Sequence, residues 1–185
     1  MNDVQESVYA GLDRRVGAFF IDVLLVYLLI GLIQYAVVIV SGGFPFNSID
    51  TGREYQVWFL LTVSLPLWLY FTLLESSPPG ATPGKRLLKV RVVGLDGEGI
   101  RFGRALVRTV VKMLPWELVF VTVLLPDPLF LDPTVVARPA VFLLYFLLGL
   151  YLLAPILSPR KRSIHDWIAR TLVVNTGIAP PGERS

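Results

Sequence analysis

Long hydrophobic runs alternate along this chain with short segments rich in glycine, proline and charge. Four runs have about the length that a helix needs to cross a bilayer, roughly 20 residues. They cover residues 16–40, 56–74, 105–125 and 139–157. This pattern predicts an all-α polytopic membrane protein with four transmembrane helices, organised as a single domain over residues 1–185. The first run exceeds the apolar region of a signal peptide, about 7–15 residues, so we expect a retained helix.

Two short segments have an alternating pattern instead. The sequence LLKVRVVG alternates basic and apolar residues from Lys89 to Val92, which is typical of a β-strand. The sequence RTLVVNT, residues 170–176, is a second β-rich segment. An isolated strand would leave its backbone groups unpaired. We therefore predict that the two segments pair with each other, or with residues near Ile100, in a small cytoplasmic β-hairpin or strand cap.

The composition agrees with a membrane protein. Hydrophobic residues make up 54% of the 185 positions and charged residues only 17%, whereas soluble domains have roughly 25% charged residues. The chain has no cysteine and one histidine, which excludes disulfides, thiolate chemistry and a histidine-based metal cluster. The sequence GATPGKR lacks the spacing of a phosphate-binding loop. We expect no cofactor and no resident metal.

Basic residues are distributed unequally among the segments that join the runs. All but two of the 17 lysines and arginines fall on one side of a four-span arrangement, and Arg53 and Arg138 are the exceptions. Short loops rich in lysine and arginine stay in the cytoplasm. We therefore expect an inner-membrane protein with both termini, the loop 75–104 and the tail 158–185 in the cytoplasm. The sequence pI near 9.3 then reflects contact with anionic lipid headgroups rather than with nucleic acid.

A carboxylate, Asp22, lies within the first hydrophobic run. A charged acid at the bilayer centre costs roughly 2.5–3.5 kcal/mol, so Asp22 needs a cation, a proton or water nearby. Arg15 lies two helical turns earlier, and Arg108 and Lys112 open the third run at a similar depth. We predict a buried ion-pair cluster between the first and third helices near the inner leaflet, in which Asp22 pairs with Arg108 or Lys112.

Two other acids in the apolar runs need an explanation. Glu117 follows Pro115 in the third run. It either lines a cavity opened by a proline kink or bonds backbone groups that the proline loosens. Glu75, at the end of the second run, is predicted to form an interfacial salt bridge with Lys85 or Arg86.

The segment after the fourth run contains Asp166 and the single histidine. Asp166 stands three residues after Ser163, as in a capping box, and could pair with Arg162 or Arg170. Alternatively, it docks onto the basic cluster together with Asp22. We expect His165 to lie on the surface.

Several stretches taken together resemble the RDD family of bacterial and archaeal membrane proteins, which is named for one arginine and two aspartates. They are RVGAFFID (15–22), TPGKRLLKVRVVGLDG (82–97), ALVR (105–108) and RSIHDWIARTLVV (162–174). In this resemblance Arg15 and Asp22 match the arginine and the first aspartate, and Asp166 matches the second. It implies a membrane protein for which transport has been suggested, with ion–proton exchange for some members.

Two classes of function follow from these observations. In the first, the protein is a small transporter or a cation/proton exchanger that binds a monovalent cation or proton at Arg15, Asp22, Arg108, Lys112, Glu117 and Asp166. Four helices form a thin wall, so this class implies a homo-oligomer. In the second, the protein is a membrane scaffold or accessory subunit whose charge cluster is structural and whose cap binds a partner protein. No nucleophile–base pair is evident, so we expect no enzyme activity.

Overall fold

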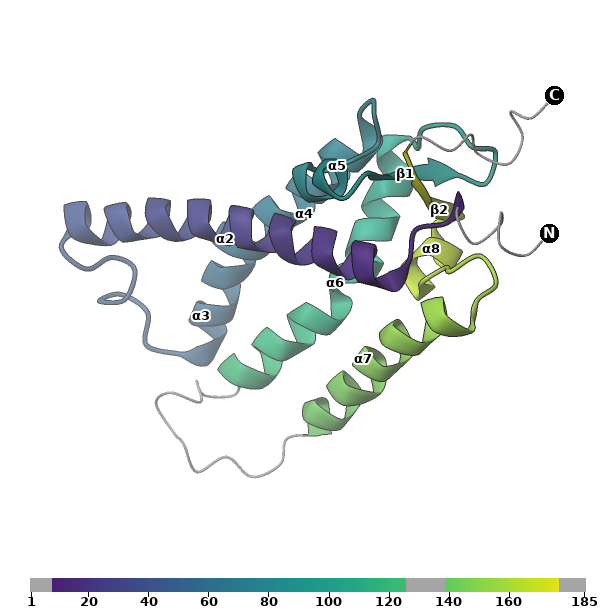
Figure 1. The fold of residues 1–185 in the computed structure, drawn as a ribbon. Helices are drawn as coiled ribbons and strands as arrows, with labels where there is room; N and C mark the ends of the chain where they lie inside the picture. The colour runs from purple at the N-terminus through teal and green to yellow at the C-terminus, as the bar shows by residue number, and fades with distance from the viewer. Residues whose placement is uncertain (1–7, 126–138, 177–185) are drawn as a thin grey trace.

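The computed structural model describes residues 8–125 and 139–176 (Figure 1). Helices lie at all four positions that the hydrophobic runs predicted. The first is α2 (Leu12–Ser41), and the second joins α3 (Gly52–Phe59), a π-helical turn η1 (Leu60–Ser64) and α4 (Leu65–Ser76). The third and fourth are α6 (Phe102–Leu124) and α7 (Pro139–Leu157). The shorter elements are α5 (Pro83–Leu87), β1 (Val90–Gly94), α8 (Ile164–Ile168) and β2 (Thr171–Asn175).

Two helical stretches of the described chain are long and apolar enough to cross a membrane, Leu12–Ser41 and Gly52–Ser76. In α7 the apolar part is shorter, Phe142–Leu157. In α6 four charged residues, Arg104, Arg108, Lys112 and Glu117, interrupt the apolar sequence. The chain is therefore a largely helical protein with two candidate membrane helices.

Apolar side chains on α2 face outward along much of its length. Leu24, Leu28 and Leu32 are each 60% or more exposed. Large contiguous apolar surfaces are rare on soluble monomers. On a helix of this length, such a surface suits contact with lipid acyl chains.

The predicted strand pairing is confirmed. β1 and β2 form an antiparallel pair in which Val92 lies opposite Val173. On the other edge of β2, the Ala10 N–H donates to the Val173 carbonyl at 3.0 Å, and Tyr9 forms a β-bridge with Val174. Ile100 does not pair with either strand but packs against them in the apolar core. We call this unit the strand cap.

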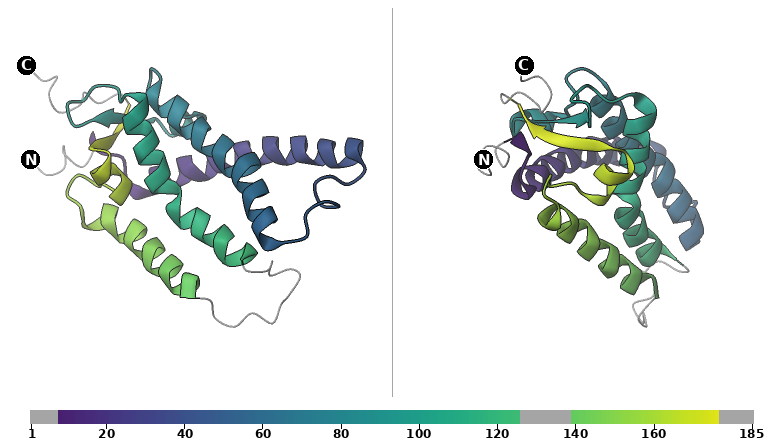
Figure 2. Two further views of the ribbon diagram at one scale, coloured as in Figure 1. Left: turned by 180° about the vertical axis from the view of Figure 1, so that it is seen from behind. Right: turned by 90° about the vertical axis from the view of Figure 1, so that its right-hand side faces the viewer.

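The strand cap gathers segments that are far apart in the sequence. α8 precedes β2 directly, α5 precedes β1, and α2 begins beside the sheet (Figures 1 and 2). A separate apolar core joins α2, α4 and α6 through Val26, Leu67, Phe71 and Met113. The region between this core and the strand cap contains most of the buried charge.

Candidate functional site

Two fully buried carboxylates, Glu75 and Asp166, form the centre of a charge cluster between the helices and the strand cap. Arg108, on α6, joins them. Its Nη1 lies 3.3 Å from Glu75 Oε2, and its Nη2 lies 2.9 Å from Asp166 Oδ1. A buried charge is tolerated only when it is paired and hydrogen-bonded. Arg108 meets this requirement for both acids at once.

Glu75 lies in the last turn of α4 and binds three cations. Lys85 Nζ, from α5, lies 2.5 Å from Oε1, and Lys112 Nζ, from α6, lies 3.2 Å from the same oxygen. The predicted salt bridge between Glu75 and Lys85 is confirmed. It is fully buried, however, rather than interfacial, and it belongs to the cluster.

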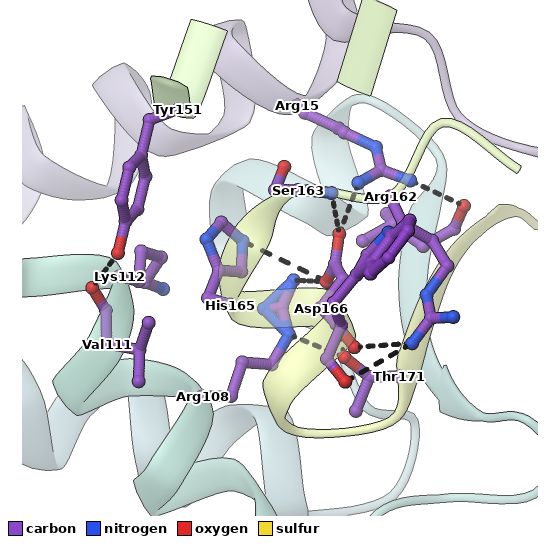
Figure 3. A network of polar contacts seen from close by, with 12 residues as sticks. Arg15, Arg108, Val111, Lys112, Tyr151, Arg162, Ser163, His165, Asp166 and Thr171 are labelled. Atoms are coloured by element: carbon purple, nitrogen blue, oxygen red, sulfur yellow. Dashed lines mark hydrogen bonds and ion pairs between the residues drawn. The ribbon is translucent and has the colours of Figure 1, made fainter. Parts of the chain in front are cut away.

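Asp166 is held from four directions (Figure 3). Arg15 Nη1 lies 2.6 Å from Oδ2, the Ser163 backbone N–H donates to Oδ2 at 3.0 Å, and Thr171 Oγ1 donates to Oδ1 at 3.2 Å. Burial raises the pKa of Asp166, but the positive charges, Arg108 foremost, outweigh burial and hold this pKa below its ordinary value. Both alternatives for Asp166 hold in part, because it accepts the capping bond and also docks onto the basic residues.

Arg15 connects α2 to the strand cap. Besides Asp166, it donates from Nε to the Ala10 carbonyl at 3.0 Å and from Nη2 to the Val173 carbonyl at 3.4 Å. The planar guanidinium presents five N–H donors in fixed directions, which suits such a three-way junction. A lysine could not form the same set of bonds.

His165 is not the surface residue that we expected. Its side chain is only 12% exposed, and Nε2 lies 3.8 Å from Asp166 Oδ1. Burial lowers the pKa of His165 to about 3, so the imidazole is neutral at physiological pH. Among the described residues, Nδ1 is buried without a hydrogen-bond partner.

The predicted pairing of Asp22 with Arg108 or Lys112 is wrong. Asp22 is fully buried but forms no ion pair with any described residue. Tyr70 and the backbone N–H of Gly84 each donate to Oδ1 at 2.8 Å, and the Thr82 hydroxyl donates to Oδ2. Neutral donors therefore satisfy this acid.

The N-terminal turn of α5 places the Thr82 hydroxyl and the Gly84 N–H against α2, whereas Tyr70 reaches Asp22 from α4. Pro83 is the first residue of α5. The Gly84 N–H therefore lies in the first turn, where a backbone N–H has no partner within the helix. A Cβ added at Gly84 would lie 2.4 Å from the Ala18 carbonyl oxygen and 3.0 Å from the Asp22 carboxylate. Glycine is thus required for the close approach of α5 to α2.

Glu117 does not join the cluster. In the described structure, no hydrogen bond or ion pair links it to Arg15, Arg108 or Asp166, and it does not line the cavity described next. The residues before it, Pro115 and Trp116, do line that cavity. Of the six residues predicted for the site, Arg15, Arg108, Lys112 and Asp166 therefore come together, while Asp22 and Glu117 lie apart.

A cavity of about 350 Å³ adjoins the cluster between α2, α6, α7 and α8. Every ionised side chain that lines it is basic: Arg15, Lys85, Arg108 and Lys112. Aromatic and aliphatic side chains form most of the remaining wall, among them Phe19, Phe20, Phe71, Trp116, Leu148 and Leu152. The volume lies in the range of small-molecule sites, roughly 300–1,000 Å³.

A proline and a tyrosine shape the far side of this cavity. Pro115 lacks the N–H that would bond the Val111 carbonyl, four residues earlier in α6. The Tyr151 hydroxyl, from α7, donates to that carbonyl instead (Figure 3). The proline thus creates an acceptor that fixes α7 against α6.

Sequence reasoning missed the central position of Glu75, the role of Tyr151 and the cavity. The sequence contained a clue to the position of Glu75, because an acid at the end of an apolar run needs more than one exposed partner. It also contained a clue to the unbonded Val111 carbonyl, because Pro115 stands four residues later. The cavity depends on side chains from four helices and has no local signature.

Metal chemistry finds no support in the described residues, which include no group of three or more histidine, cysteine or acidic side chains placed to hold a metal ion. The charged groups that line the cavity are instead the ammonium groups of Lys85 and Lys112 and the guanidinium groups of Arg15 and Arg108.

Comparisons with known proteins give a consistent family. The RDD family model matches residues 9–170. The uncharacterized protein YxaI of Bacillus subtilis (strain 168) is 32% identical over 111 residues, which cover 54% of this chain and 72% of that relative. No solved structure matches this chain significantly.

Proposed function

This chain belongs to the RDD family, and we propose that it is a small membrane transporter whose charge cluster binds an anion at the inner end of four membrane-crossing helices. The outward apolar surface of α2, the helices at all four predicted positions and the unequal distribution of basic residues support this arrangement. Both termini, together with the strand cap, then lie in the cytoplasm.

The cavity lining is the observation that carries the proposal. Glu75, Asp166 and Asp22 are fully buried and bonded, whereas the charged groups that reach the cavity are all cations. A site that selects cations would present carboxylate oxygens to its ligand. The geometry therefore favours an anion as the bound species over a monovalent cation.

Charge displacement in proteoliposomes on a solid-supported membrane tests this proposal. Rapid jumps of inorganic phosphate or acetate should produce protein-dependent currents, and sodium jumps should not. Lys112→Gln should reduce the anion currents, because it removes a cation from the cavity. Arg104→Gln removes the same charge from an exposed position of α6 and should leave the currents unchanged.

Cation/proton exchange is the second candidate, and the neutral environment of Asp22 favours it. No described cation forms an ion pair with this carboxylate, and three neutral donors contact its two oxygens. Currents that follow sodium jumps and disappear in Asp22→Asn would establish exchange in place of anion transport.

A scaffold role is the third candidate, supported by the bonds that join α2, α4, α5, α6 and α8 in one cluster. Under this alternative, no ion jump produces a current. Cluster variants would instead lose folding, and a protein partner would co-purify from native membranes with the wild-type chain but not with a variant of the strand cap.

A further inference from the structure

The cavity beside the charge cluster has two chemically different sides. Lys112, Arg108 and His165 lie at its polar end. Apolar side chains of α2 and α7, among them Phe20, Leu148 and Leu152, line much of the remainder. A ligand that satisfies both sides must combine a negative charge with hydrocarbon.

The polar end retains unused hydrogen-bonding capacity. An ammonium group has three N–H donors. In the described structure, Lys112 Nζ donates one hydrogen bond, to Glu75, and lies 3.4 Å from the centre of the Phe71 ring. His165 Nδ1, also at the cavity, has no hydrogen-bond partner among the described residues. The Lys112 ammonium therefore has donors available to an acidic oxygen, and His165 Nδ1 is a second polar atom without a described partner.

The apolar side reaches the outer surface of the helices. Phe20 is 58% exposed and Leu152 is 54% exposed, although both line the cavity. Figure 1 and the left panel of Figure 2 show α2 and α7 diverging from their common end near α8. In the membrane arrangement proposed above, this side faces lipid rather than water.

We propose that the cavity binds the acidic headgroup of an anionic membrane lipid, whose acyl chain leaves between α2 and α7. The proposal rests on the proposed function for the orientation of the helices in the bilayer and for the preference of the cavity for anions. A volume of about 350 Å³ accommodates a headgroup and the first part of a chain. The remainder of the lipid stays in the bilayer.

A free anion would use only half of this site. Inorganic phosphate would contact the cations but would leave Phe19, Phe20 and Leu148 facing an empty apolar space. Burial of hydrocarbon against such walls contributes roughly 25 cal/mol per Å². The lipid therefore binds more tightly than its headgroup alone.

Native mass spectrometry of the full chain in detergent tests the proposal. Phosphatidylglycerol and phosphatidylcholine with identical acyl chains are titrated separately, and inorganic phosphate is a third arm. We expect phosphatidylglycerol to bind at least about tenfold more tightly than phosphatidylcholine, as charge-assisted bonds to one headgroup imply. Inorganic phosphate should displace it only weakly.

Three variants assign the site. Lys112→Gln should weaken phosphatidylglycerol binding about fivefold, as expected for the loss of one charge contact, and leave phosphatidylcholine unchanged. Leu148→Trp fills the apolar side without a change of charge and should weaken both lipids. Arg104→Gln, on the exposed face of α6, is the matched control and should bind like wild type.

Several results would overturn the proposal. These are equal affinity for the two lipids, an equal loss in Arg104→Gln, or full displacement by phosphate alone. The proposed transport is tested separately. Phosphate currents without lipid selectivity would support transport and refute lipid binding. Lipid selectivity without any current would support lipid binding and refute transport. Size-exclusion profiles establish whether each variant is folded. If Lys112→Gln does not fold, Leu148→Trp still tests the site.

Discussion

Arg108 contacts both buried acids of the cluster and also donates from Nε to Thr171 at 3.3 Å. Each acid keeps other partners without it, since Glu75 also binds Lys85 and Lys112, and Asp166 also binds Arg15. Among the described residues, Arg108 is thus the one side chain that forms ion pairs with both Glu75 and Asp166.

We expect Arg108→Gln to lower the free energy of unfolding by roughly 3 kcal/mol, the low end for breaking a buried pair, because the acids keep their other cations. Equilibrium unfolding in mixed detergent micelles measures this loss. Arg104→Gln, at an exposed position of the same helix, should change the free energy by less than about 0.5 kcal/mol. Equal stabilities of the two variants would contradict the central role of Arg108.

His165 predicts a pH dependence of stability. Its pKa is about 3 in the folded protein and roughly 6.5 when unfolded, so the unfolded chain takes up the proton first. Stability is therefore full above pH 6.5 and falls as the pH drops from there toward 3, by roughly 2 kcal/mol between pH 7 and pH 5.

The melting temperature of the purified protein between pH 7 and pH 5 checks this expectation. His165 is the one histidine of the sequence, so His165→Gln isolates its contribution directly. The variant should show a much flatter pH profile than wild type. Parallel profiles would mean that His165 does not remain neutral in the folded protein.

At the scale of elements, α5 fixes α2 by supplying neutral donors to Asp22. The turn that begins α5 must approach the α2 backbone closely, and Gly84 permits this approach. A methyl group at this position would push α5 away and weaken the bonds from Thr82 and Gly84.

We expect Gly84→Ala to cost roughly 1–3 kcal/mol, as overpacking usually does. Gly103→Ala is the matched control, because a Cβ at Gly103 meets no atom within 4 Å and alanine favours the helix. Unfolding measurements on both variants test the difference. If Gly84→Ala were as stable as wild type, the close contact between α5 and α2 would be refuted.

The sequence predicted elements better than it predicted partners. Hydropathy located the helices, and alternation around Val92 and Val173 located the paired strands, because both signals are local and periodic. The choice of partners is not local. Asp22 and Arg108 have similar predicted depths, but depth does not determine which face of each helix meets the other.

The partners of the buried acids could likewise be predicted only in part from the sequence. Arg15 and Asp166 were placed in one site through the resemblance and their charges, and they do meet. The cations expected for Asp22 bind Glu75 instead, because α4 rather than α2 packs its acid against α6. Two of the three neutral donors of Asp22, the Thr82 hydroxyl and the Gly84 N–H, lie in a proline–glycine turn, whose conformation only the folded chain defines.

At the scale of the whole molecule, the exposed apolar surfaces and the basic strand-cap side define the proposed orientation. Ser48 and Lys89 are exposed, and the proposed arrangement places them on opposite sides of the membrane. The sequence contains no cysteine, so single cysteines introduced at these positions give an unambiguous signal.

We expect Ser48→Cys to react with a membrane-impermeant maleimide in intact cells, because residue 48 lies in the outer loop of the proposed arrangement. Lys89→Cys should react only after the membrane is permeabilised. Labelling of both sites, or the opposite pattern, would refute the proposed topology. A maleimide that crosses the membrane should label both variants and controls for access to each thiol.

The bond between Arg15 and Asp166 spans 151 positions of the chain. During synthesis on the ribosome, Arg15 and Arg108 emerge well before Asp166, and only Glu75 is present to neutralise the positive charges that gather beside it. The last helix and β2 therefore complete the assembly, and copies whose translation stops before residue 166 retain uncompensated guanidinium groups. The charge cluster is consequently complete only once Asp166 has been made, after all four helices described above.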